Sequence, residues 1–320
     1  MASSSAFVTD HSSVRLKCIR CGSLDLHQAA ATLVCPECQA AFPVLRGVPR
    51  FVARELYSES FGFQWNRFAR TQLDSANGST RSRDTFIQKT GLSLASLRGK
   101  RVLDAGCGMG RFAEVCADAG AEVHAIDLST AVEAAHANLG HRPNVHIYQA
   151  DIMRLPFADE SFDIIYSIGV LHHTPDTRNA FMALPALLKP GGLIAIWVYS
   201  RKLRVFVGGE LLRTVTPSLP KPLLLRASRI AVPLYHLHRL RFVGQLTSVL
   251  LPTSMNPDPQ WRWLDTFDWY SPKYQWKHTY DEVEGWFREA GLMDIVTGEV
   301  PVSIQARKPT QDYSRNAVQR

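Results

Sequence analysis

The chain has 320 residues, of which 46% are hydrophobic and 20% are charged, and this composition is typical of a globular protein rather than a disordered chain. The length allows one α/β core of about 200 to 220 residues with smaller additions. Residues 1–13 lack a basic start followed by an apolar run, and no stretch of about eighteen apolar residues occurs, so we expect a cytoplasmic protein without a secretory signal or membrane span.

Four of the six cysteines lie near the start of the chain, in a segment that we expect to form a separate module over residues 1–55. They form two Cys-x-x-Cys pairs with thirteen residues between the pairs, and residues 25–34 suit a single hairpin. Each pair can place two thiolates on one tetrahedral metal ion. The sequence therefore predicts a structural zinc site with four ligands, namely Cys18, Cys21, Cys35 and Cys38. A redox-active site or a site without metal are the alternatives.

Residues 56–100 carry aromatic side chains at helical spacing, followed by a polar loop over 74–82. Phe61, Trp65 and Phe68 would form the apolar face of a helix that packs on the edge of a sheet. A second helix is expected over 85–90, ending near Gly91.

Residues 101–200 alternate between strand and helix patterns. We expect strands over 101–105, 122–126, 145–149, 162–167 and 193–199, and helices over 111–119, 130–138 and 176–188, the last kinked at Pro185. Such alternation requires right-handed crossovers and a parallel sheet covered on both faces. Ligands bind beyond the carboxyl ends of such strands, which fall at Asp104–Gly110, Asp127, Asp151 and Ser167–His173.

The segment from Val102 to Phe112 joins the first of these strands to a helix through a glycine-rich turn. Gly106, Gly108 and Gly110 let the backbone pass close to a ligand, and the helix that follows points unpaired N–H groups at it. Asp127 ends the next strand, twenty-one residues after Gly106, where a carboxylate can accept hydrogen bonds from both hydroxyls of a ribose.

Residues 201–276 form an insertion that holds most of the positive charge. The whole chain carries +7, whereas residues 200–251 contain nine basic residues and one acidic residue, a net charge of +8. We expect two or three short amphipathic helices in this part, followed by an aromatic part over 261–276. The insertion is either a lid over a large acceptor with an anionic group, or a solvated basic face with aromatic residues completing the core. Contact of residues 201–251 with a membrane surface is a further interpretation of this part.

Residues 277–310 are expected to complete the core. Thr279 and Glu282 form a capping box, which predicts a helix through Ala290 that stops at Gly291. Two strands over 292–300 and 302–307 are separated only by Pro301, so they should pair antiparallel. Residues 311–320 are expected to be a flexible tail.

The motifs of residues 101–199 together resemble those of the class I S-adenosylmethionine (SAM) methyltransferases, with a core of the quinone- and metabolite-modifying type. The likeness rests on the glycine turn and Asp127, on Gln149–Ile152, on Phe162–Asp176 with its Val-Leu-His-His-Thr-Pro run, and on Lys189–Gly192. It implies an α/β fold with a seven-stranded, Rossmann-like, mostly parallel sheet whose last strand is antiparallel. Residues 41–51 resemble the end of Trm112-like zinc ribbons, which are partners or fused modules of methyltransferases.

The resemblance also implies roles for individual residues. Gly106, Gly108 and Gly110 would cradle the methionine part of SAM, Asp104 would hold the turn, Asp127 would bind the ribose, and Asp151 with Ile152 would frame the adenine. Ser167 is assigned to the cofactor site as well. Segments in the position of residues 56–100 often fold over the cofactor, which is a second interpretation of that segment.

His172 and His173 follow the fourth strand, where the acceptor usually meets the sulfonium. Either could deprotonate a hydroxyl, because an imidazole titrates near neutral pH. The alternative is that they cap the next helix or pack beneath the cofactor. The loop lacks the Asn-Pro-Pro-Tyr type of sequence that methylases of exocyclic base amines use.

We therefore expect a SAM-dependent methyltransferase that acts on a small molecule of natural-product, lipid-linked or sugar-containing type. An enzyme acting on ribosomal or transfer RNA, or on a translation factor, is the alternative, supported by the zinc ribbon and the basic insertion, since clustered cations neutralise phosphates. A SAM-binding subunit without catalysis is a third option. The sequence does not determine the oligomeric state.

Overall fold

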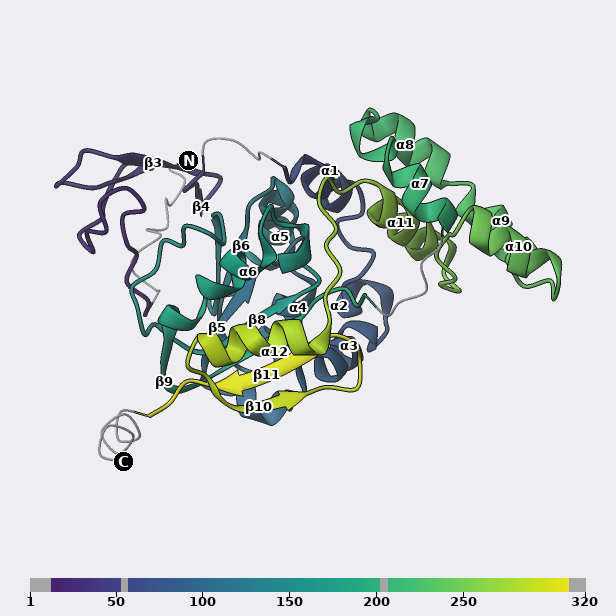
Figure 1. Ribbon diagram of the computed structural model, residues 1–320. Coiled ribbons are helices and arrows are strands. Elements are labelled where there is room, and N and C mark those ends of the chain that lie inside the picture. Colours follow the sequence, from purple (N-terminus) through teal and green to yellow (C-terminus); the bar gives the residue numbers. More distant parts are fainter. Residues whose placement is uncertain (1–12, 53–56, 202–206, 311–320) are drawn as a thin grey trace.

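The computed structural model describes residues 13–52, 57–201 and 207–310 (Figure 1). Three expectations fall on residues outside these ranges. They are the flexible tail over 311–320, the module boundary at residues 55–56, and the contribution of the cations Lys202 and Arg204 to the insertion. Within the described ranges, no helix is long and apolar enough to cross a membrane.

A seven-stranded sheet forms the centre of the molecule, in the order β10-β11-β9-β8-β5-β6-β7. Its strands are β5 (Arg101–Ala105), β6 (Glu122–Asp127), β7 (Val145–Gln149), β8 (Phe162–Ile168), β9 (Leu188–Trp197), β10 (Met293–Thr297) and β11 (Ser303–Arg307). The five neighbouring strands β9, β8, β5, β6 and β7 pair in parallel, and β11 runs antiparallel to both β9 and β10. The expected mostly parallel sheet with an antiparallel last strand is confirmed.

Helices cover both faces of the sheet, because the central strands are apolar on both sides. One face packs on α3 (Arg81–Thr90), α4 (Arg111–Asp118) and α5 (Ala131–Leu139), in a core that includes Phe86, Val123 and Tyr166. The other packs on α6 (Thr177–Met182) and α12 (Tyr280–Glu289), through Phe181 and Phe287. The predicted capping box at the start of α12 is present.

A small four-stranded antiparallel sheet forms the N-terminal module (Figure 1). Its strands are β1 (His27–Ala29), β2 (Thr32–Val34), β3 (Ala41–Leu45) and β4 (Val48–Pro49), and β1 and β2 form the expected hairpin. The cysteine pairs lie in the segments before β1 and between β2 and β3. This module sits on the free edge of β7, where the N–H of Phe51 donates to the carbonyl of Gln149 at 2.8 Å and the Arg50 guanidinium donates to the Gln149 side chain at 3.1 Å. The module thus extends one edge of the main sheet.

Two further groups of helices lie beyond the strand ends. The first comprises α1 (Glu59–Arg67) and α2 (Asp74–Asn77), and the second comprises α7 (Val207–Arg213), α8 (Lys221–Ser228), α9 (Ala231–His238), α10 (Val243–Leu250) and α11 (Pro259–Tyr270). A cluster of Phe68, Leu224, Leu225, Leu264, Phe267 and Tyr270 holds α1, α8 and α11 together. The insertion is therefore anchored on the segment that precedes the first strand of the main sheet.

Several predicted boundaries differ from the structure. The helix expected over 176–188 ends at Met182, and Pro185 starts a separate 3₁₀ turn over Pro185–Leu187 rather than kinking a continuous helix. β9 starts at Leu188, five residues before the predicted position, because Leu188 already pairs with Phe162 of β8. The Lys189–Gly192 segment then forms an irregularity in the register, and regular pairing resumes at Leu193 opposite Ile164. The expected loop 74–82 contains α2, and residues 207–251 hold four helices instead of two or three.

Candidate active site

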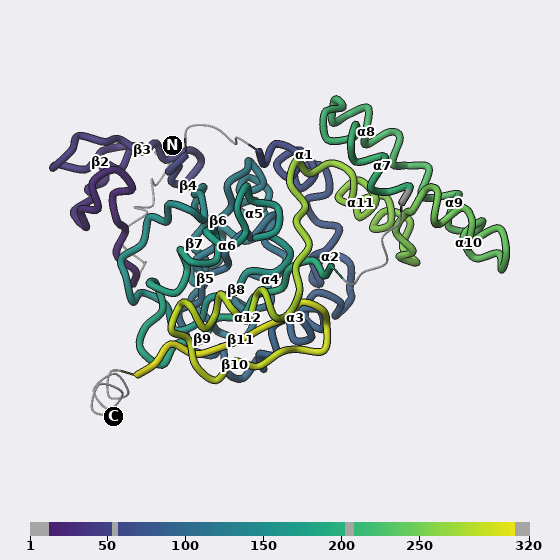
Figure 2. The backbone as a smooth tube through the Cα atoms, viewed as in Figure 1, coloured from purple at the N-terminus to yellow at the C-terminus, as the bar shows by residue number. Residues whose placement is uncertain are grey.

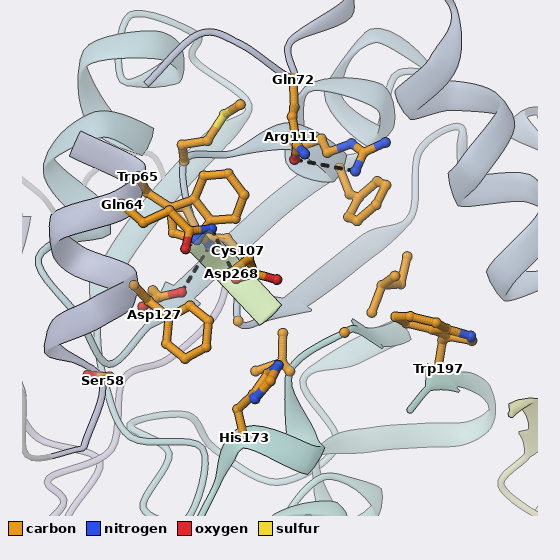
Figure 3. Close-up of a pocket in the computed structure, with 18 of the residues that line it drawn as sticks. Ser58, Gln64, Trp65, Gln72, Cys107, Arg111, Asp127, His173, Trp197 and Asp268 are labelled. Atoms are coloured by element: carbon orange, nitrogen blue, oxygen red, sulfur yellow. Dashed lines mark hydrogen bonds between the residues drawn. The ribbon is translucent and has the colours of Figure 1, made fainter. Parts of the chain in front are cut away.

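The glycine turn between β5 and α4 forms the floor of a cavity of about 470 Å³ at the carboxyl ends of the strands (Figure 3). Gly106 has φ +100°, and a Cβ at this position would lie 2.4 Å from Cγ1 of Val170. Gly110 has φ +93°, and its Cβ would lie 2.7 Å from Leu139. Gly106 and Gly108 line the cavity, whereas Gly110 serves the contact between α4 and α5.

Asp127 lies beside this turn and points at the cavity (Figure 3). Its Oδ2 accepts a hydrogen bond from the N–H of Gly108 at 2.9 Å, and its Oδ1 accepts from the N–H and the hydroxyl of Ser129 at 2.8 and 2.6 Å. Burial raises the pKa of Asp127, and these three donors oppose the rise. The carboxylate is thus held in one orientation by its neighbours.

Of the four other residues predicted to bind the cofactor, only one lines the cavity. Ile152 lines the cavity, but Asp151 does not, and its Oδ1 accepts from the N–H of Met153 at 2.9 Å. Asp104 is buried beneath the turn, and burial raises its pKa to about 7. Ser167 is also buried, and its hydroxyl donates to the carbonyl of Ala105 at 2.7 Å. Asp104 and Ser167 therefore support the turn from behind.

The two adjacent histidines have different surroundings. His173 lines the cavity, and its Nδ1 donates to the carbonyl of Tyr274 at 2.8 Å, which leaves Nε2 with the lone pair. Burial lowers its pKa to about 4, so the ring is neutral at physiological pH. His172 is fully buried, stacks on Tyr199 with 3.9 Å between ring centroids, and is not part of the cavity wall. The structure therefore brings only His173 to the site.

Helix α1 contributes aromatic side chains to the cavity wall, and the second interpretation, that residues 56–100 fold over a cofactor, stays a prediction. Phe61 and Trp65 line the cavity, and the Trp65 ring lies over Gly108, where an added Cβ would be 3.0 Å from Nε1. Phe68 instead packs in the cluster shared with α8 and α11. The helix thus covers the turn with one part of its surface and anchors the insertion with another.

The far wall of the cavity contains carboxylates that the sequence analysis missed. Asp265 and Asp268 lie three residues apart on α11 and therefore share one helix face. The side-chain amide of Gln64 on α1 donates to Oδ1 of Asp268 at 3.0 Å (Figure 3). Burial raises the pKa of Asp265 to about 7 and that of Asp268 to about 6.

Two cations face these carboxylates from the body of the protein. The Lys89 ammonium on α3 lies 3.2 Å from the centroid of the Trp197 ring, and burial lowers the pKa of Lys89 to about 7. The Arg111 guanidinium is fixed by Gln72, Ser82 and Thr85. Both cations line the cavity, whereas no cation of the 207–251 segment does.

Arg213 of α7 does not line the cavity, but it donates to the carbonyls of Trp269 and Pro272. Burial raises the pKa of Asp268 and lowers that of His173, and the charge of Arg213 acts to lower both. The role of the insertion as a clamp for an anionic acceptor stays a prediction.

The aromatic part of the insertion divides between cavity and core. Trp261 and Trp269 line the cavity, while Trp263 and Phe267 pack in the cluster with Phe68. A sequence signal for Asp265 and Asp268 existed, since two carboxylates at helical spacing within a tryptophan-rich helix are unusual in a core. Gln64 and Lys89 had no such signal, because they reach the site only through the packing of α1 and α3.

The four cysteines predicted to bind metal converge on one point. The Sγ atoms of Cys18 and Cys38 are 3.6 Å apart, as are those of Cys21 and Cys35, and all four lie within 4.8 Å of one another. Zn–S bonds of about 2.3 Å in a tetrahedron place sulfur atoms about 3.8 Å apart. The donor set and its spacing therefore fit a zinc ion.

Comparison with known proteins relates the main domain to methyltransferases. Residues 103–196 match a family model described as a methyltransferase domain. A ubiquinone biosynthesis O-methyltransferase of Aromatoleum aromaticum is 33% identical over 173 residues, which cover 51% of this chain and 71% of that protein. The O-methyltransferase cnsE of Penicillium expansum is 36% identical over 118 residues, 35% of this chain and 43% of that protein.

Among solved structures, human N-acetylserotonin methyltransferase in complex with SAM is 18% identical with a TM-score of 0.44, and the match covers 78% of this chain and 56% of that chain. The chain spans about half the length of the first curated relatives that it matches. The glycine turn, the strand order and the relative covered over 71% of its length lead to one conclusion. The chain belongs to the family of SAM-dependent methyltransferases.

Proposed function

We propose that this protein transfers a methyl group from SAM to a hydroxyl of a small-molecule acceptor. The observation that carries this proposal is the single cavity that joins the glycine turn and Asp127 to the aromatic and acidic wall of α11. Its volume of about 470 Å³ lies in the range of small-molecule sites. Relatives of this chain bear the name O-methyltransferase, which supports oxygen as the methylated atom.

When bound, SAM supplies an electrophilic methyl group on a sulfonium. The backbone of Gly106 and Gly108 would hold its methionine part, Asp127 would accept hydrogen bonds from its ribose, and Ile152 would pack on its adenine. Helix α1 would close over the site and exclude water, because Phe61 and Trp65 already stand above the turn. Orientation for in-line attack is the main contribution expected of the protein.

Asp268 and His173 are the two candidates for the base that takes the proton of the acceptor hydroxyl, because both line the cavity and are in their basic form at pH 7. Asp265 also lines the cavity, but with a pKa of about 7 it is only half ionised at this pH, and no described hydrogen bond from Gln64 orients it. Asp268, with a pKa of about 6, is the stronger base, since the pKa of His173 is about 4. We therefore assign the proton transfer to Asp268, held by Gln64, and give His173 a role in orienting the acceptor. For His172, which lies behind Tyr199, no contact with the acceptor is expected.

The cysteine module is proposed to bind one structural Zn²⁺ through Cys18, Cys21, Cys35 and Cys38. A closed shell of four thiolates leaves no position for a substrate, so the ion would stabilise the module and take no part in methyl transfer. Because this module extends the edge of β7, it supports the strand that leads to Ile152. A cytoplasmic location stays a prediction.

Transfer of labelled methyl from SAM into a fractionated cell extract tests the proposed acceptor class. Label in an organic-soluble or small polar fraction is expected, and the Asp127→Ala variant should give little or none at the same SAM concentration. Nuclease-sensitive label in large RNA would contradict the small-molecule proposal and support the RNA alternative. Absence of transfer, with SAM binding intact, would indicate a binding subunit instead.

A further inference from the structure

Helices α7 to α10 form an arm, residues 207–251, that projects from the body of the protein (Figures 1 and 2). The arm is compact in itself. A Cβ on Gly244 would lie 2.1 Å from the carbonyl oxygen of His238, and one on Gly208 would lie 2.1 Å from that of Leu250, so α10 packs closely against α7 and α9. The arm joins the body through α11, which contacts α7, α8 and α9.

One face of α10 presents apolar side chains to solvent. Phe242 is 80% exposed, Leu246 63% and Leu250 62%, and Val243 and Val249 are each 46% exposed. Their spacing places all five on the same side of the helix. The arm holds eleven of the eighteen large hydrophobic side chains that are exposed in the described parts of the chain. An apolar patch of this kind marks an interaction surface.

The arm is also strongly basic. Residues 207–251 contain six basic residues and one acidic residue, a net charge of +5. The acidic residue, Glu210, is paired with Lys277. The cations Arg226, Arg229, Arg239 and Arg241 are exposed, and none of them forms an ion pair with a described residue.

We propose that the arm docks on an anionic lipid bilayer, with α10 lying in the plane of the interface and its apolar face turned into the lipid. Arginine side chains beside an apolar face suit this position, because they reach up to lipid phosphates while their stems stay in apolar surroundings. Pairing of two arms about a twofold axis would instead bring two surfaces of charge +5 together. A nucleic acid would leave the five apolar side chains of α10 without a partner.

The arm and the cavity share a helix, which gives the docking a functional consequence. Trp261, Asp265 and Trp269 on α11 line the cavity, and Leu264 and Phe267 of the same helix pack on Leu224 and Leu225 of α8. Helix α11 therefore links the docked arm to the acceptor wall of the cavity. Docking would then favour an acceptor that is itself found at the bilayer surface, and this last step rests on the proposed methyl transfer.

Co-sedimentation of the full chain with vesicles tests the docking. Vesicles of phosphatidylcholine with phosphatidylglycerol should bind the protein, and vesicles of phosphatidylcholine alone should bind it weakly. Each neutralised arginine in Arg239→Gln/Arg241→Gln should weaken binding about fivefold. Phe242→Asp/Leu246→Asp should weaken it at least about tenfold, because two apolar side chains no longer enter the lipid. The matched control is Leu45→Asp, since Leu45 is 54% exposed but lies on β3.

Circular dichroism and SAM binding by calorimetry should be unchanged in all three variants, which separates docking from the proposed function. Equal binding of the wild type and Phe242→Asp/Leu246→Asp to anionic vesicles would overturn the proposal. So would a dimer in size-exclusion chromatography that this variant dissociates while vesicle binding stays absent. In that case a second copy of the chain covers the apolar face. Binding of the arm to RNA but not to vesicles would overturn it as well.

Discussion

Removal of the Asp127 carboxylate is the sharpest test of the proposed cofactor site. In the structure this carboxylate lies on the cavity wall and is oriented by Gly108 and Ser129. Two hydrogen bonds from ribose hydroxyls to a charged group contribute about 1.5–3 kcal/mol each, or about 3–6 kcal/mol together. Asp127→Ala should therefore weaken SAM binding by about two to four orders of magnitude.

The alanine variant also leaves the N–H of Gly108 and the N–H and hydroxyl of Ser129 without their acceptor, so a lower melting temperature is expected. Asp127→Asn separates the two effects, because the amide oxygen keeps one acceptor while the charge is lost. Its SAM affinity should lie between those of the wild type and the alanine variant.

Isothermal calorimetry with SAM measures the affinities, and Asp163→Asn is the matched control. Asp163 also accepts a backbone N–H, that of Arg101 at 2.9 Å, but it lies outside the cavity. The control should bind SAM like the wild type. If Asp127→Ala is folded and binds SAM within about threefold of the wild type, a difference below about 0.7 kcal/mol, the assigned role of Asp127 is wrong.

Three further predictions concern the turn, the base and the metal. Gly106→Ala should lower the free energy of unfolding, measured in urea, by about 2–6 kcal/mol, because the added Cβ clashes with Val170 and the φ angle is unfavourable for alanine. The double variant Gly106→Ala/Val170→Ala should recover part of the lost stability. A loss below about 0.5 kcal/mol in Gly106→Ala would contradict the geometry. The rate of methyl transfer should rise with pH through about 6, because Asp268 acts as a base only when it is ionised, and Asp268→Asn should abolish this inflection. A flat rate profile from pH 5 to 8 in the wild type would exclude Asp268 as the base. That flat profile is expected if His173, with a pKa of about 4, takes the proton. Metal analysis should find one zinc ion per chain, and the Cys35→Ala variant should lose it. The control Cys116→Ala should keep the zinc, because its buried thiol is not part of the four-cysteine cluster. Zinc retained by Cys35→Ala would refute the site.

Local sequence patterns determined the elements that neighbouring residues fix on their own. The glycine turn, the strand that ends at Asp127, the capping box at Thr279 and the paired cysteines all follow from spacings of a few residues. Positive φ angles, helix caps and metal knuckles depend on short stretches of chain, so the sequence is sufficient to locate them. The parallel pairing of the core strands followed as well, because alternation of strands and helices requires right-handed crossovers.

Tertiary packing decided which side chains reach the cavity. His172 and His173 are neighbours with the same chemistry, yet the turn of Leu171–His173 buries one behind Tyr199 and points the other at the site. Asp268 meets Gln64 across 204 residues of sequence, and Lys89 meets Trp197 across 108. The cations of residues 207–251 looked like a substrate clamp in the sequence, but none of them lines the cavity, and Arg213 reaches it only through the carbonyl of Trp269. Such contacts arise between distant segments, and no local spacing encodes them.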